Sequence, residues 1–285
     1  MKISTEISSF RSWGGNREIL RLLKDSGFDA YDFSMFRGDK DRIVDDSHYI
    51  REAESLREYA ASLGIVCNQS HAPFPTALPG DDAFNAAMFD EIVRAIEVSG
   101  ALGAKVCVVH PCNYYTAEQN AGLYTRFEPF ARRAGVKIGV ENMWNWKEGE
   151  THACAAACSE HGDFLRHLTL LPEDVFVACL DIGHAEMAGL NTSAVQMIET
   201  LGGRLQAIHL HDNDRVHDNH ELPYSRNISF GPVIGALKKI GYWGDITLEA
   251  SSFPPRFPAA LYPAVARLMA GVADSFRTAL AEQKA

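Results

Sequence analysis

The segment from Ala207 to His220, AIHLHDNDRVHDNH, holds four histidines and three aspartates within fourteen residues. It begins as an apolar strand and turns polar abruptly. Imidazole and carboxylate groups are the side chains that bind zinc, manganese and iron. Aspartate and asparagine also satisfy the backbone of ordinary turns after strands. By itself the segment therefore supports either a metal site or a polar turn.

Other strand-like runs of the chain end in side chains of the same kind. In chain order, the residues at the ends of the third to eighth runs are His71, His110, Glu141, Asp181, His209 and Glu249. One polar residue at the end of a strand is common, but six consecutive strands share this feature. If the fold brings these ends together, a divalent-metal site is favoured over a hydrogen-bonded polar network.

Four of these side chains form a ligand set of three carboxylates and one imidazole: Glu141, Asp181, His209 and Glu249. Such a set favours Mn²⁺, Mg²⁺ or Co²⁺ over a purely structural zinc ion, and it leaves room for two oxygens of a sugar. A metal ion bound there can polarise a carbonyl and acidify the adjacent carbon or hydroxyl. Glu141 and Glu249, on opposite sides of a substrate, could then transfer a proton as base and acid.

Three further residues are candidates for contact with a substrate. His184, in the motif LDIGHA, follows the sixth strand end by three residues and either faces the same pocket or caps a helix at the surface. Arg215 could bind a hydroxyl or phosphate group, or be an exposed loop arginine. Trp144 could stack on a sugar ring or pack against the core. We expect His211 and His217 to lie behind the metal ligands or at the surface.

The elements that would position these residues alternate regularly along the chain. Strands are expected at 2–7, 30–35, 65–72, 105–111, 136–142, 175–181, 205–211 and 245–250. Helices are expected at 16–25, 46–63, 83–102, 117–133, a segment ending near 168, 192–201, 232–240 and 259–281. This alternation predicts an α/β fold, a single (β/α)8 TIM barrel formed as one domain by residues 1–285. A doubly wound open sheet is disfavoured because no glycine-rich phosphate loop follows the first strand.

Composition limits the classes of partner. The 285 residues carry a net charge of −10, which disfavours a nucleic acid as partner because phosphate contacts need a basic surface. The N-terminus has no apolar signal segment, and no apolar run approaches the roughly 20 residues that span a bilayer. Three of the six cysteines lie in apolar strands, so we expect reduced thiols and a cytoplasmic protein with no membrane partner. The oligomeric state stays open, a homo-oligomer included.

Several motifs together resemble the xylose isomerase-like barrel superfamily. They are GVEN, LDIGHA, IHLHD, the Asp-x-His of Asp218 and His220, and the final TLEA. That superfamily contains sugar-phosphate isomerases and epimerases, ketose 3-epimerases and metal-dependent apurinic endonucleases of the endonuclease IV type. The resemblance covers nearly the whole chain, since the matching motifs fall in order on the third to eighth strands.

The resemblance implies roles for individual residues. The shared metal site of the superfamily would be Glu141, Asp181, His209 and Glu249, and by likeness to ketose 3-epimerases the two glutamates would transfer the proton. In those enzymes the positions of His184 and Arg215 hold substrate oxygens. By likeness to endonuclease IV, further residues would be ligands of a cluster of two or three zinc ions: His71, His110, His184, Asp218 and His220.

The sequence favours a divalent-metal-dependent isomerase or epimerase. It would act on a sugar or sugar phosphate through a metal-stabilised enediolate, with one Mn²⁺, Zn²⁺, Co²⁺ or Mg²⁺ ion. The alternatives are a zinc-dependent phosphoesterase of the apurinic endonuclease type and a polyol dehydratase on the same scaffold. The sequence ELPYSRNISFG, where many relatives have Pro-Gly-x-Gly after Asp-x-His, and the negative net charge both argue against a nuclease. A non-catalytic sensor is disfavoured because ligand binding does not require both glutamates.

Overall fold

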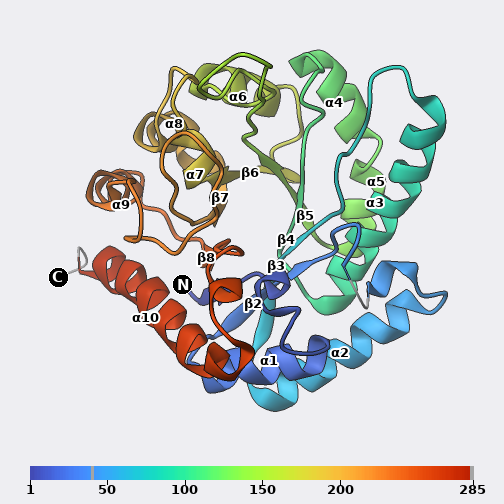
Figure 1. Cartoon of the computed structure of the whole chain (residues 1–285). Helices are drawn as coiled ribbons and strands as arrows, with labels where there is room; N and C mark the ends of the chain where they lie inside the picture. The colour runs from blue at the N-terminus through green and yellow to red at the C-terminus, as the bar shows by residue number, and fades with distance from the viewer. Residues whose placement is uncertain (40–41, 283–285) are drawn as a thin grey trace.

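A computed structural model of the chain describes residues 1–39 and 42–282 and places its strands around a common centre, with helices outside them (Figure 1). Every pair of neighbouring strands is parallel. The strands are β1 (Ile3–Thr5), β2 (Ala30–Ser34), β3 (Val66–His71), β4 (Val106–Val109), β5 (Lys137–Glu141), β6 (Phe176–Asp181), β7 (Leu205–His209) and β8 (Ile246–Leu248). Each lies within a run that the sequence predicts as a strand.

The strands form two hydrogen-bonded sheets. Strands β2 to β7 pair in sequence order, and β1 pairs with β8. Isolated parallel bridges, Glu6 with Asp32 and Leu210 with Leu248, lie where the two sheets meet. The expected barrel of eight alternating strands is therefore a TIM-barrel fold whose ladder is not one continuous ring. The reason is that β1 and β8, with three residues each, form their ladder with one another.

The helices surround the strands. They are α1 (Asn16–Asp25), α2 (Tyr49–Leu63), α3 (Asp82–Leu102), α4 (Ala117–Thr125), α5 (Glu128–Ala134), α6 (His161–Thr169), α7 (Ile182–Ala185), α8 (Ala194–Leu201), α9 (Phe230–Lys239) and α10 (Tyr262–Ala281). The prediction of a single helix over 117–133 is wrong, because the segment forms two helices, α4 and α5. It is broken before α5, whose first turn contains Pro129, because proline has no backbone N–H to continue the hydrogen-bond pattern of α4. No helix of residues 1–39 and 42–282 is both long and apolar enough to cross a bilayer.

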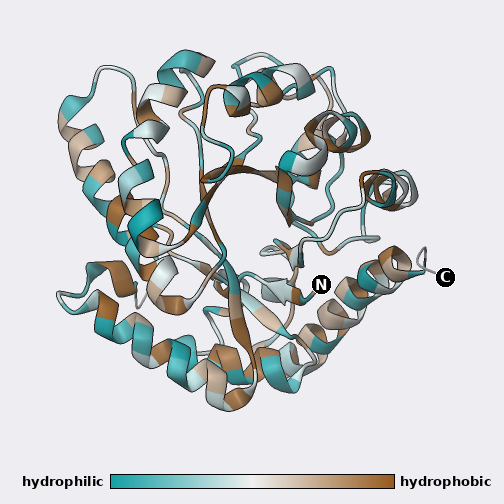
Figure 2. Cartoon of the chain, turned by 180° about the vertical axis from the view of Figure 1, so that it is seen from behind, coloured by the Kyte–Doolittle hydropathy of each residue, from teal (hydrophilic) through white to brown (hydrophobic). Residues whose placement is uncertain are grey.

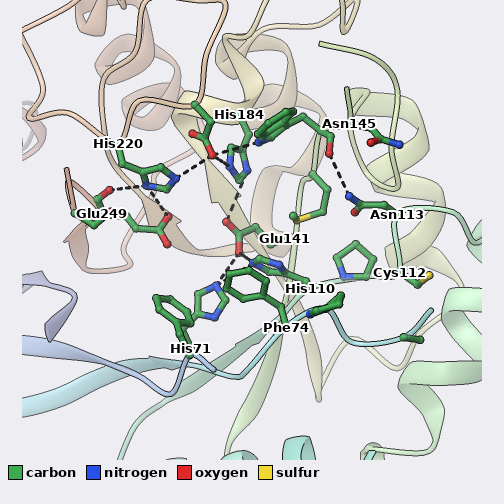
Figure 3. Close-up of a pocket in the computed structure, with 18 of the residues that line it drawn as sticks. His71, Phe74, His110, Cys112, Asn113, Glu141, Asn145, His184, His220 and Glu249 are labelled. Carbon is green, nitrogen blue, oxygen red and sulfur yellow. Dashed lines mark hydrogen bonds and ion pairs between the residues drawn. The ribbon is translucent and has the colours of Figure 1, made fainter. Parts of the chain in front are cut away.

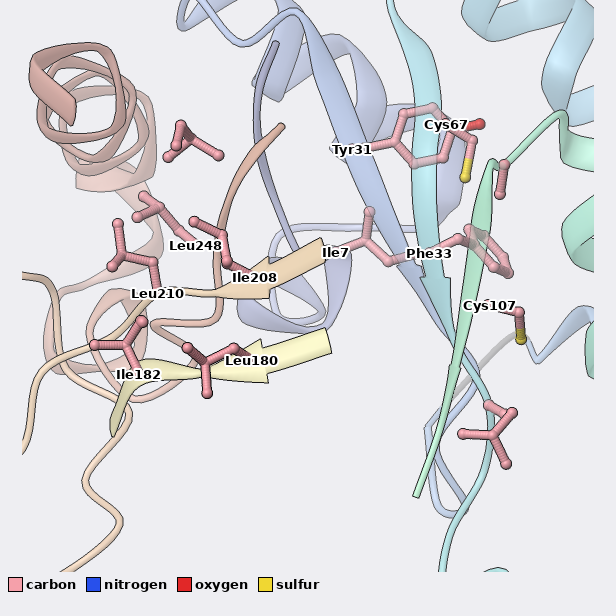
Figure 4. Packing of buried hydrophobic residues seen from close by; sticks show 14 of the residues in the cluster. Ile7, Tyr31, Phe33, Cys67, Cys107, Leu180, Ile182, Ile208, Leu210 and Leu248 are labelled. Atoms are coloured by element: carbon pink, nitrogen blue, oxygen red, sulfur yellow. The ribbon is translucent and has the colours of Figure 1, made fainter. Parts of the chain in front are cut away.

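Apolar side chains fill the space between strands and helices. Ile7, Phe33, Leu180, Ile208 and Leu248 are buried in this layer (Figure 4). In Figure 2 the strands near the centre are coloured mostly as hydrophobic, whereas the hydrophilic colour is concentrated on the helices. All six cysteines are free thiols, as the sequence predicts.

A second, smaller apolar cluster fills the inside of the barrel. It consists of Val106, Val108, Val177, Cys179 and Ala207. The packing there is tight, because a Cβ added to the glycine at 139 in β5 would lie 2.9 Å from Cγ1 of Val106. A filled interior leaves the ends of the strands as the place where a ligand can enter.

We expect Gly100→Ala to destabilise the fold. An added Cβ on α3 would lie 2.5 Å from the carbonyl oxygen of Ala134, the last residue of α5, so the two helices would have to move apart. The free energy of unfolding, measured by urea denaturation, should fall by about 1–3 kcal/mol. Gly122→Ala in α4 is the matched control, because nothing lies within 4 Å of its added Cβ. It should raise stability by about 0.5–1 kcal/mol. Equal effects of the two changes would contradict this packing.

Candidate functional site

The carboxyl ends of the strands carry ionisable side chains around one cavity of about 760 Å³ (Figure 3). The six strand-end residues predicted from the sequence lie together here, in overlapping groups whose potential ligand atoms are within 4.8 Å of one another: His71, His110, Glu141, Asp181, His209 and Glu249. They meet because parallel strands of a barrel present the same ends to the same side. Asp181 and His209 are fully buried beneath the residues that line the cavity.

The central group consists of Glu141, Asp181, His209 and Glu249. Nδ1 of His209 lies 3.0 Å from Oε1 of Glu141 and 3.1 Å from Oε2 of Glu249. Oδ2 of Asp181 is buried without a hydrogen-bond partner. Oε2 of Glu141 and Oε2 of Glu249 are also buried, and they lie 3.0 Å from Nε2 of His110 and 3.1 Å from Nδ1 of His209, respectively. Burying an unpaired carboxylate oxygen is costly, and a divalent cation among these oxygens would compensate each of them. The donor set therefore fits a divalent ion.

A second group shares Glu141 and adds His71 and His110. Nε2 of His110 lies 3.0 Å from Oε2 of Glu141, and Nε2 of His71 lies 3.4 Å from the same oxygen. The two Nε2 atoms are 3.0 Å apart. Nδ1–H of His71 donates to the carbonyl of Ala72 at 2.8 Å, which leaves its Nε2 without a proton when the ring is neutral. An imidazole held this way presents a bare nitrogen to a metal ion.

A third group gathers around Asp218. Nε2 of His184 and Nε2 of His220 lie 3.1 and 2.9 Å from its Oδ2. Both imidazoles donate their Nδ1–H to backbone carbonyls, those of Asn142 and Glu249, at 2.9 Å each. Both Nε2 atoms are thereby directed at the carboxylate, and Oδ1 of Asp218 has no hydrogen-bond partner. This group also fits a metal ion.

His211 lies against Asp181, which is one of the two positions expected for it, and not at the surface. It is fully buried, with Nε2 3.0 Å from Oδ1 of Asp181 and 3.6 Å from Oδ1 of Asp218. It joins the third group. The sequence contained the signal, because residues two apart on a strand face the same side and His211 follows His209 by two. His217 is exposed and pairs with Asp214, as expected.

Two buried acids of the first two strands were also missed. Asp32 in β2 accepts a hydrogen bond from Nε2 of Gln69 at 2.8 Å and lies 3.6 Å from Nε2 of His209, at the distance of an ion pair with the protonated ring. Glu6 follows β1 and lines the cavity. Burial, together with the nearby charge of Glu249, raises the pKa of Glu6 to about 7. Applying the strand-end criterion to the first strand would have found Glu6, whereas Asp32 lies inside β2 and has no such signal.

The charges of the site depend on one another. Burial opposes ionisation of Glu141, but the neighbouring His209 and His110 hold its pKa well below the usual value. Burial disfavours the charged form of His184, but the carboxylates of Asp181 and Asp218 raise its pKa to about 10. The carboxylates thus require positive charge close by, which protonated imidazoles or a bound cation can supply. Metal binding would displace those protons.

The loop after β7 positions Asp218 and His220. Its centre is Asp212, fully buried, whose Oδ1 accepts from the backbone N–H groups of Asn213 and Ile228 at 2.9 Å. Its Oδ2 accepts from the N–H of residue 226 at 2.8 Å. These bonds close the loop with the sequence ELPYSRNISFG in place of a Pro-Gly-x-Gly turn, and Asp218 and His220 still reach the site.

The predicted substrate contacts separate in space. His184 and Trp144 line the cavity, and the indole N–H of Trp144 donates to Oδ2 of Asp218 at 3.2 Å. Arg215 does not line the cavity. Its guanidinium pairs with Glu186 at 3.2 Å, and its backbone has the left-handed φ of 69°. The structure does not bring Arg215 to the cavity, because this turn directs its side chain toward Glu186.

The sequence of this chain matches one family model and is similar to known proteins. The family model described as xylose isomerase-like TIM barrel matches residues 20–270. An uncharacterized protein of Methanocaldococcus jannaschii is 30% identical over 194 residues, which are 63% of this chain and 62% of that protein. The match therefore spans less than two thirds of that relative.

Solved structures match over nearly their full lengths. A D-tagatose 3-epimerase-like protein superposes with a TM-score of 0.72 and 21% identity, over 96% of this chain and 99% of that chain. The IolI protein with a bound zinc atom superposes with a TM-score of 0.74 and 16% identity, over 99% of both chains. At these identities the likeness concerns the fold.

We expect Gly183→Ala to disrupt the third group without unfolding the protein. An added Cβ would lie 2.0 Å from Cε1 of His211, so either this ring or helix α7, which carries His184, must move. Zinc affinity, measured by competition with a chelating dye, should fall at least about 10-fold, because a displaced ligand shell costs 10–100-fold in affinity.

The control for this change is Gly231→Ala in α9, where nothing lies within 4 Å of the added Cβ. It should bind zinc like the wild type, and both variants should keep the wild-type circular dichroism. Unchanged zinc affinity in Gly183→Ala would show that His211 and α7 do not support a metal site.

Proposed function

This chain belongs to the xylose isomerase-like TIM barrel family, and we propose that its residues 1–285 form one catalytic domain, a divalent-metal-dependent isomerase or epimerase of sugars. The observation that carries the proposal is the pair Glu141 and Glu249. These carboxylates come from the ends of β5 and β8, both line the cavity, and both approach the same atom, Nδ1 of His209. Two carboxylates that face one substrate from different strands can act as base and acid.

The central group would hold the ion. Glu141, Asp181, His209 and Glu249 would supply its ligands, and Mn²⁺, Zn²⁺, Co²⁺ or Mg²⁺ suits this donor set. When bound, such an ion polarises a substrate carbonyl and acidifies the proton on the neighbouring carbon. The unpaired buried Oδ2 of Asp181, and the buried oxygens of Glu141 and Glu249 that lie beside imidazole nitrogens, support this role.

The chain's own residues would carry out the proton transfer. One glutamate removes the proton from the carbon beside the carbonyl, and its partner returns a proton to the opposite face of that carbon, which inverts the centre. In an isomerisation, one glutamate would instead move the proton between the two adjacent carbons. Asp32 would hold the ring of His209 in place during the reaction. In both cases the two carboxylates must lie on different sides of the substrate, and their origin at β5 and β8, which do not pair with one another, supports this.

The walls of the cavity suit a small substrate. Phe36, Phe74, Met143 and Trp144 line it, and its volume of about 760 Å³ lies within the range of small-molecule sites. Trp144 can stack on the apolar face of a sugar ring, while its N–H is bound to Asp218. The similarity to a D-tagatose 3-epimerase-like protein supports a sugar as substrate.

We expect Glu141→Gln and Glu249→Gln each to lower kcat by about 10²–10⁴-fold, because an amide cannot exchange the proton. Turnover of ketoses would be followed in D₂O, where the wild type should place solvent deuterium in the product. Metal content, measured for every variant, separates lost proton transfer from lost metal. Glu199→Gln is the control, since this glutamate pairs with Lys239 at the surface. If a sugar is turned over and deuterium never enters it, a hydride shift replaces proton transfer.

A second candidate has one observation in its favour. The group with His71 and His110 shares Glu141 with the central group, and the group around Asp218 contacts the central group where His211 approaches Asp181, so the site could hold more than one ion. This arrangement favours a zinc-dependent phosphoesterase of the apurinic endonuclease type, as the resemblance to endonuclease IV implies. The net charge of −10 weighs against it, because a protein that binds DNA gains affinity from basic groups on phosphates.

Metal stoichiometry separates the two candidates. For the isomerase we expect chelation to abolish turnover of a ketose and one equivalent of Mn²⁺ or Co²⁺ per chain to restore it. The measurement is elemental analysis of protein purified without added metal, followed by titration of activity. Three zinc ions per chain together with cleavage of an abasic DNA duplex would reverse the ranking.

A further inference from the structure

Among the described residues that line the cavity, the charged side chains other than histidine are all acidic. Five carboxyl groups line it: Glu6, Asp39, Glu141, Asp218 and Glu249. Among residues 1–39 and 42–282, no lysine or arginine does so. Only imidazoles offer positive charge there, and the metal-capable groups use them. A substrate phosphate would find no cationic side chain among these residues, although such groups usually bind phosphates in proteins.

Glu6 stands apart from the metal-capable groups. It is a member of none of the metal-capable groups found among the described residues. Its backbone is fixed, because its N–H donates to the carbonyl of Leu248 at 3.1 Å and the residue bridges to Asp32. The metal-capable groups therefore leave the role of this carboxyl unexplained.

The side chain of Glu6 is held at the cavity but incompletely paired. It is 1% exposed. Its Oε1 accepts from the hydroxyl of Ser9 at 3.5 Å, a long contact, and its Oε2 has no hydrogen-bond partner. A buried carboxyl oxygen without a partner costs free energy unless a ligand satisfies it. Since Glu6 lines the cavity, a ligand there can do so.

We propose that Glu6 contacts the substrate, accepts a hydrogen bond from one of its hydroxyl groups, and makes the site selective for unphosphorylated sugars over sugar phosphates. The inference rests on the proposed function. A hydroxyl group satisfies a carboxylate oxygen, whereas a phosphate group offers only acceptor oxygens and negative charge. Because the pKa of Glu6 is raised to about 7, this carboxyl is negatively charged above that pH. There Glu6 stabilises the neutral sugar and repels the phosphorylated one, so that one group supplies both parts of the discrimination.

Asp39, a second acid that lines the cavity, serves as the control for Glu6. It also lines the cavity, but the guanidinium Nε of Arg11 lies 3.7 Å from its Oδ2 and partly neutralises its charge. Glu6→Gln and Asp39→Asn each remove one negative charge from the cavity. Only the first removes the carboxyl that we assign to the substrate.

The test uses binding, so that turnover is not needed. Metal-loaded wild type, Glu6→Gln and Asp39→Asn are titrated in a calorimeter with two matched pairs of probes. The pairs are D-fructose with D-fructose 6-phosphate, and D-tagatose with D-tagatose 6-phosphate. We expect the wild type to bind an unphosphorylated member about 10-fold or more tighter than its phosphate. Glu6→Gln should weaken binding of the free sugar by about 10-fold and lower the ratio of the affinities for the free sugar and its phosphate. Asp39→Asn should change neither the affinity for the free sugar nor this ratio.

Glu6→Asp covers the case in which the glutamine variant does not fold. It keeps the negative charge but shortens the side chain by one methylene. It should therefore bind the free sugar more weakly than the wild type does and still bind the sugar phosphate poorly. Metal content and circular dichroism are measured for every variant.

The inference is overturned if the wild type prefers a phosphate. It is also overturned if Asp39→Asn lowers the discrimination as much as Glu6→Gln, since net charge would then suffice. If neither pair binds to the wild type, the proposed function fails and the inference with it. If instead the sugars bind and Glu6→Gln leaves the preference for the free sugar unchanged, the inference fails and the proposed function stands.

Discussion

Negative charge removed from water is the constraint on which the rest of this structure depends. Glu141, Asp181, Asp218 and Glu249 each have an oxygen shielded from solvent. Those of Asp181 and Asp218 have no hydrogen-bond partner, and those of Glu141 and Glu249 lie beside imidazole nitrogens. Such a cluster is stable only where positive charge lies among the carboxylates, because desolvation of an unpaired anion costs more than packing can return. The surrounding imidazoles meet this need, either as protonated rings or as ligands of a shared cation. The donor set of this site suits a cation, and the barrel supplies the rigidity that keeps its charges close.

Backbone carbonyls decide which ring nitrogen faces the carboxylates. His71, His184 and His220 each donate Nδ1–H to a carbonyl oxygen, so all three present Nε2. The ring of His209 has the opposite orientation, since its Nδ1 faces Glu141 and its Nε2 faces Asp32. These contacts fix ring orientation before any ligand arrives, which reduces the entropy lost on metal binding. The geometry of the loops and strand ends is therefore part of the chemistry.

The groups share residues, which couples them. Glu141 belongs both to the central group and to the group with His71 and His110, and His211 connects Asp181 with Asp218. A scaffold of this kind can serve sugar chemistry with one ion or phosphoester chemistry with several, so the ligand types alone do not distinguish the reactions. The aromatic walls and the carboxyl of Glu6 lie outside the metal-capable groups, and the proposal of an uncharged sugar rests on them.

The sequence by itself determined the alternation of strands and helices and the identity of the residues at six strand ends. Both are local properties, because strand periodicity and the polar residue that follows a strand are written in neighbouring positions. Only the tertiary structure decided the roles of His211, Asp32 and Glu6 and the departure of Arg215 from the cavity. Those outcomes depend on which way a side chain points and on which distant strand lies opposite it. Glu6 and Glu249 line one cavity although nearly the whole chain separates them, since β1 pairs with β8. Spacing along the sequence does not encode that proximity; the closing of the strands around a common centre creates it.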